Sequence, residues 1–114
     1  PLEDLWIDTH LSLSGAPTGN DFEARVMGAI KDIFDKAARS ATAETPARIH
    51  YAGLHEAIAR LIVNIRVVRL RITVTHTRDG LVEELDSEDG EATIGPREQA
   101  IPRKPRLRIE GGDG

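Results

Sequence analysis

The side chains of this 114-residue chain that could carry chemistry are its four histidines, a glutamate that directly follows one of them, and the proline at position 1. His50, His55 and Glu56, in "HYAGLHE", form the only local group that resembles metal ligands. A zinc-protease helix needs two histidines four positions apart with a glutamate after the first, and "HEAIA" lacks the second histidine. On a helix, His50 and His55 would point about 140° apart. We therefore predict no metal site.

The other two histidines lie in segments with the alternation of strands. His76 continues an apolar face that includes Ile72 and Val74, so we predict a core histidine at the end of a strand. His10 falls on the polar face of an earlier alternating segment. The sequence leaves open whether His10, His50, His55 or His76 has a chemical role.

Pro1 resembles the catalytic proline of the tautomerase superfamily, whose secondary amine acts as a base or nucleophile. That resemblance implies an enzyme that uses Pro1, but "PLED" places two acids where the superfamily continues directly into an apolar strand. A phosphate-binding loop with its lysine and a serine nucleophile elbow are also absent from the sequence. We predict no catalytic residue and no cofactor.

Composition narrows the classes of protein that remain. The chain contains no cysteine, which excludes disulfides, thiolate metal sites and a cysteine nucleophile. No stretch approaches the roughly 20 apolar residues of a membrane span. We expect a protein of the cytoplasm, or one held within an assembled particle.

Charge is distributed unevenly along the chain. Residues 1–96 contain ten basic and sixteen acidic residues, whereas residues 97–114 contain five basic and three acidic ones. The segment "EELDSEDGE", residues 83–91, holds six acids in nine positions. An acidic body therefore precedes a basic C-terminal segment.

Residue periodicity predicts the elements that would position these side chains. Residues 5–13 alternate as a strand, and apolar residues at helical spacing predict a helix over residues 21–40. For the segment from Thr45 to Ile62 we favour helix throughout, although residues 47–52 also fit a short strand. The stretch "NIRVVRLRITVTHT", residues 64–77, is then predicted as a strand, and "RDG" predicts a hairpin turn into "LVEEL".

These elements predict an α+β fold with a small, mostly antiparallel sheet, two helices on one face and an extended C-terminal arm. We place a single α+β domain at 1–96 and the basic arm at 97–114. Prolines at 96, 102 and 105 exclude a helix from the arm and leave an extended path that becomes a strand only near its end.

The arm repeats a four-residue strand sequence. "RLRI" occurs at residues 69–72 and again at 106–109, and direct pairing of the two copies would set arginine against arginine. We therefore do not expect them to pair. Instead we predict that residues 103–110 add as an edge strand to another copy of the protein. The predicted interface residues are Arg69, Arg71, Arg106, Leu107, Arg108 and Ile109.

The sequence thus favours a non-enzymatic structural subunit of a homo-oligomer or larger particle, phage-like or secretion-like, which associates through sheet edges and the arm. Its partners would be copies of itself or other subunits of that particle. The alternative is a small enzyme that uses Pro1 or a histidine site. The third hypothesis is a nucleic-acid-associated protein. The single tryptophan and the net charge of −4 disfavour it.

Overall fold

The computed structural model describes residues 2–110, which are arranged around one long central strand, β1 (Glu3–Leu13). Pro1, the candidate catalytic residue, lies outside the described residues. The elements that follow β1 are α1 (Phe22–Ser40), β2 (Ala47–His50), α2 (Tyr51–Ala59), β3 (Val67–His76), β4 (Val82–Leu85), β5 (Glu91–Ile94), β6 (Glu98–Pro102) and β7 (Arg106–Ile109). The predicted α+β class is confirmed.

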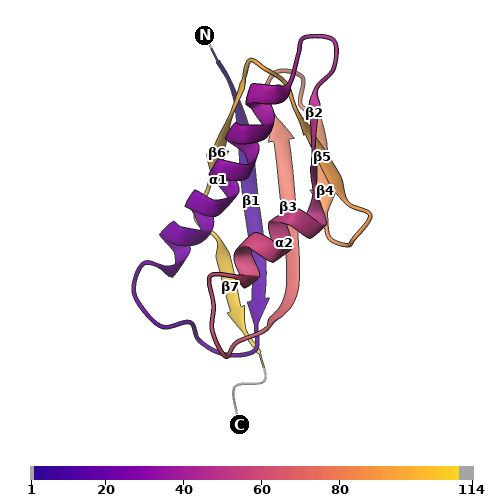
Figure 1. The fold of residues 1–114 in the computed structure, drawn as a ribbon. Coiled ribbons are helices and arrows are strands. Elements are labelled where there is room, and N and C mark those ends of the chain that lie inside the picture. Colours follow the sequence, from indigo (N-terminus) through magenta and orange to yellow (C-terminus); the bar gives the residue numbers. More distant parts are fainter. Residues whose placement is uncertain (1, 111–114) are drawn as a thin grey trace.

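The main sheet has the order β4-β3-β1-β6, with β7 also paired to β1 (Figure 1). β3 runs antiparallel to β1 over nearly its whole length. On the other edge of β1, β6 pairs in parallel with the first half of the strand and β7 pairs in parallel with the second half. A separate two-stranded sheet joins β2 to β5. The sheets are mostly antiparallel, as predicted.

Both helices cover the same face of the main sheet (Figure 1). The buried residues of α1 recur every four positions, which places them on one stripe of the helix: Phe22, Val26, Ile30 and Phe34. Every second residue of β1 from Leu5 to Leu13 is buried on the helix side, because strand side chains alternate between faces. The opposite face of the sheet has no helix over it among the described residues. Neither helix there is long and apolar enough to cross a membrane.

One prediction about local structure is wrong. Residues 47–50 form the strand β2, and the helix begins only at Tyr51, so the segment from Thr45 is not helical throughout. β2 is held by antiparallel pairing with β5, a partner more than 40 positions away that the local pattern does not reveal. The predicted hairpin is confirmed, with Gly80 at φ 77 in the turn between β3 and β4.

The prediction that residues 103–110 add as an edge strand to another copy of the protein is also wrong, because β7 pairs with β1 of its own chain. Arg106 to Ile109 pair with His10 to Leu13 of the same chain, and the amide of Glu110 donates to the carbonyl of Leu13 at 2.8 Å. The step between β6 and β7 is held as well, because the amide of Arg103 donates to the carbonyl of Ile7 at 2.9 Å. The arm completes the sheet from within. As predicted, the two "RLRI" copies do not pair directly, since β1 separates them.

We predict that truncation after Pro102 lowers the melting temperature by several degrees. The truncation leaves the backbone groups of residues 10–13 without partners on one edge and removes Leu107, which packs against the core. Leu107→Ser alone should cost about 1–2 kcal/mol, because this side chain is only partly buried.

The matched control is Ile109→Ser, at a position on the same strand that is 45% exposed. It should change the unfolding free energy less than Leu107→Ser does. Thermal unfolding followed by circular dichroism measures all three variants. Equal stability of the truncated and full chains would contradict the pairing of β7 with β1.

Candidate functional site

The sheet face opposite the helices carries polar side chains along β1. Asp4, Trp6, Asp8, His10 and Ser12 alternate with the buried residues of this strand and are partly exposed. Their neighbours on β3 and β6 alternate in the same register, so one continuous face is formed. We call this the open face of the sheet.

Four arginines meet at one end of the open face. The pairing register sets Arg71 and Arg106 on either side of His10, and sets Arg69 and Arg108 on either side of Ser12. Both pairs come from the duplicated "RLRI" segments, one on each flank of β1. We call Arg69, Arg71, Arg106 and Arg108 the arginine cluster. With His10 and Ser12 it lines a shallow cavity of about 280 Å³.

The arginine cluster has little compensating charge nearby. Within residues 2–110, no carboxylate oxygen lies within 4.0 Å of Arg69, Arg71 or Arg106, and Arg108 reaches Glu110 only at 3.9 Å. The Nε atom of Arg71 is buried and finds no hydrogen-bond partner among these residues. A buried donor without an acceptor costs about 1–3 kcal/mol. The cluster is therefore a site of unbalanced positive charge in an acidic chain.

The other end of the open face is balanced within the chain. Arg103 donates to Asp8 at 2.6 Å and lies over the ring of Trp6, with 4.9 Å from the guanidinium carbon to the ring centroid. The hydrogen bond to Asp8 raises the pKa of Arg103 above its ordinary value. Gln99 donates to Asp4 at 2.9 Å. The tryptophan is thus engaged by an arginine of its own chain.

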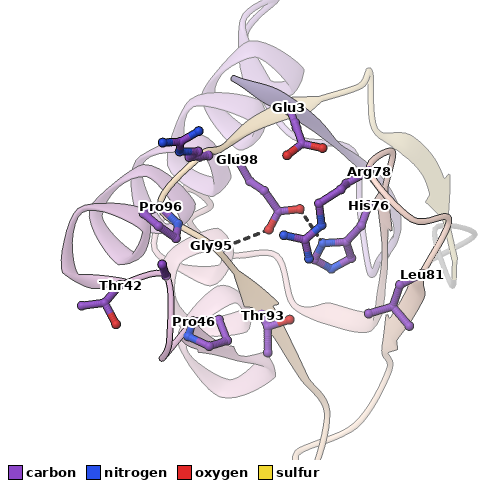
Figure 2. Close-up of a pocket in the computed structure, with 12 residues that line it drawn as sticks. Glu3, Thr42, Pro46, His76, Arg78, Leu81, Thr93, Gly95, Pro96 and Glu98 are labelled. Carbon is purple, nitrogen blue, oxygen red and sulfur yellow. Dashed lines mark hydrogen bonds and ion pairs between the residues drawn. The ribbon is translucent and has the colours of Figure 1, made fainter. Parts of the chain in front are cut away.

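A second polar group lies on the helix side, where β3 ends (Figure 2). His76 Nδ1 lies 2.7 Å from Glu98 Oε2, and His76 Nε2 lies 2.5 Å from Glu83 Oε1. Glu98 also accepts a hydrogen bond from the amide of Gly95 at 2.8 Å, and Glu83 accepts from the amide and hydroxyl of Thr93, each at 3.2 Å. This Glu83–His76–Glu98 triad joins the ends of four strands.

The triad favours a protonated imidazole. Burial by itself lowers the pKa of His76, but the hydrogen bonds that the ring donates to Glu83 and Glu98, together with the negative charges of these carboxylates, outweigh burial and raise the pKa above 6.5. Both ring nitrogens face carboxylate oxygens, as imidazolium requires. The prediction of a buried strand-end histidine is confirmed, because the side chain is 2% exposed.

A pocket of about 260 Å³ opens beside the triad (Figure 2). Its polar lining includes Glu3, Thr42 and Arg78, and its apolar lining includes Pro46 and Leu81. Two members of the triad, His76 and Glu98, also line the pocket, but their side chains are only 2% and 3% exposed. Proton exchange with a molecule in this pocket would require the triad to open.

The remaining histidines are not brought together. His50 lies 3.4 Å from Glu91 across the β2–β5 pair, and the ring of His55 stacks at a tilt on Tyr51, 5.8 Å between centroids. No group of three or more potential metal ligands occurs in the part of the chain that the structure describes. Among the predicted interface residues, the four arginines share the open face, Leu107 packs on the core and Ile109 is 45% exposed.

Known proteins give no further guide to function: a scan against protein-family models found no match, and a search of curated proteins found none.

We predict that the triad makes stability depend on pH between neutral and alkaline conditions. Because the pKa of His76 is raised in the folded state, its contribution is complete below the unfolded value of 6.5 and is lost as the pH rises through the folded-state pKa. The unfolding free energy of the parent should therefore fall with rising pH in that window. His76→Gln should remove this slope and, at pH 6, cost about 3–5 kcal/mol, since two carboxylates lose their shared cation.

Urea unfolding at a series of pH values checks this expectation. His55→Gln is the control, because His55 is outside the triad, and it should keep the slope of the parent. An identical slope in His76→Gln and the parent would show that the triad does not hold an imidazolium.

Proposed function

We propose that this protein is a non-enzymatic structural subunit that associates with copies of itself, in a homo-oligomer or a larger particle of the phage or secretion type. The observation that carries the proposal is the arginine cluster: four cations gathered on the uncovered face of the sheet, in a chain with a net charge of −4. Surfaces of unbalanced charge are typical of sites that select a complementary partner.

The same chain carries a complementary surface. Of the six acids in residues 83–91, Glu83 belongs to the triad and Glu91 pairs with Arg48 and His50. The other four have no ion pair among the described residues: Glu84, Asp86, Glu88 and Asp89. Glu84 lies on β4, whereas Asp86, Glu88 and Asp89 lie between β4 and β5, and we call these three the acidic loop. Its charge is opposite in sign to that of the arginine cluster.

We infer that the acidic loop of one copy docks on the arginine cluster of another. Exposed ion pairs contribute roughly 0–1 kcal/mol each, so charge would set the partner and the orientation rather than supply most of the affinity. Repeated contacts in a symmetric particle would strengthen a weak single contact.

The enzyme alternative has less support from the geometry. His76 is held by two carboxylates of its own chain and is almost fully covered, whereas a general base needs contact with its substrate. The nucleic-acid alternative would use Trp6 as a stacking platform, but Arg103 already lies over that ring.

The first test is the mass of the parent by light scattering across micromolar concentrations. We expect a mass that exceeds 12.5 kDa and rises with concentration. A constant mass of one chain over this range would overturn the proposal that the protein is an assembly subunit.

The second test reverses charges on each surface. Arg69→Glu with Arg106→Glu, and separately Asp86→Lys with Glu88→Lys, should each weaken self-association, because like charges then face each other. An equimolar mixture of the two double variants should restore association, since each contact between one variant and the other again joins opposite charges. Arg39→Glu with Arg60→Glu changes net charge as much as the arginine double variant does, at exposed positions on α1 and just after α2, and should leave association closer to that of the parent. Failure of the mixture to associate would exclude the docking of loop on cluster.

A further inference from the structure

The arginine cluster also has the form of a binding site within a single subunit. Neighbouring strands lie about 4.8 Å apart and alternate residues about 6.7 Å apart. The four arginine Cα atoms therefore stand near the corners of a rectangle of about 10 Å by 7 Å, with His10 and Ser12 along its midline. Long side chains from four corners can converge on one group placed above the centre.

The centre of this rectangle offers hydrogen-bond donors rather than carboxylates. Ser12 supplies a hydroxyl and His10 a ring nitrogen, and both line the same cavity as the arginines. Asp8, the nearest acid along the open face of β1, is already bound to Arg103. Within residues 2–110, the side chains that line the cavity include no acid.

The arrangement is unfavourable without an anion. Guanidinium groups stay protonated in proteins, so the four side chains repel one another across the cavity. The buried Nε of Arg71 adds the cost of an unmet donor. The fold nevertheless holds the two "RLRI" segments on either side of β1.

We propose that the arginine cluster, together with His10 and Ser12, binds a phosphate group. Guanidinium groups match phosphate oxygens in paired hydrogen bonds, and the several oxygens of one tetrahedral group can be shared among four arginines better than the two of a carboxylate. The site concerns one subunit and does not depend on self-association. Since the acidic loop would dock on the same arginines, a bound phosphate group would also oppose assembly.

The experiment uses the full chain carrying Asp86→Lys and Glu88→Lys, which removes the competing loop contact. Inorganic phosphate, pyrophosphate, glycerol 3-phosphate and chloride are titrated separately, with binding followed by calorimetry and by amide chemical shifts. We expect all three phosphates to bind more tightly than chloride, with pyrophosphate the tightest. Shifts should concentrate at residues 10–12, 69–71 and 106–108. The order of the three affinities distinguishes free phosphate from a phosphate ester.

Two sets of variants separate a built site from a general positive field. Arg71→Gln with Arg106→Gln should weaken pyrophosphate binding roughly 10- to 100-fold, whereas Arg39→Gln with Arg78→Gln, which removes two charges elsewhere, should change it less than about threefold. Arg71→Lys with Arg106→Lys keeps the charge but loses the paired donors, and should still weaken binding.

Three outcomes would overturn the phosphate site: phosphates that bind no more tightly than chloride, shifts that map elsewhere, or full affinity in the lysine variant. None of these results depends on the mass of the parent protein, which tests self-association. The experiments therefore show separately whether the phosphate site exists and whether the protein self-associates.

Discussion

The rest of this structure depends on hydrogen bonding along both edges of β1. Backbone groups of a central strand must find partners, and β3 meets this need on one edge over nine paired positions. The other edge is met by two short strands, β6 and β7, which follow each other in the same direction. Their register decides which side chains reach the open face. The juxtaposition of the four arginines is thus a consequence of how the edge of one strand is filled.

The triad at the end of β3 fixes the remaining parts to this frame. His76 contacts Glu83 of β4 and Glu98 of β6, and Glu83 in turn holds Thr93 of β5. One imidazole therefore links the main sheet to the small β2–β5 sheet. A buried charge group of this kind is favourable only when all of its polar atoms are satisfied, and both ring nitrogens of His76 have partners here. We interpret the triad as a structural joint that also borders a pocket.

The sequence predicted those elements whose signal is local. β1, α1 and the β3–β4 hairpin are long or have clear turn residues, so periodicity was sufficient. β2 and β6 have four or five residues each and depend on partners far along the chain, which periodicity does not report. β7 was predicted as a strand, but its partner in the same chain was not.

The candidate sites divide in the same way. All four arginines were predicted as interface residues, but the position of Arg69 and Arg71 across β1 from Arg106 and Arg108 depends on the pairing of β7 with β1. The triad was missed, although one signal was present: a histidine on an apolar strand face needs polar partners, and the hairpin brings Glu83 within reach.

The pairing of β1 with the end of the chain has a consequence for folding kinetics. His10 and its partner Arg106 stand 96 positions apart, so the loop that closes this contact is nearly as long as the chain itself. Such non-local contacts form slowly, because the chain loses the entropy of closing the long loop before the contact contributes any stability. During synthesis, the second half of this edge of β1 remains without a partner until residues 106–109 are available. In that interval the unpaired edge of β1 can bind a strand of another molecule. The frequency of such mispairing depends on how fast β6 and β7 pair with β1.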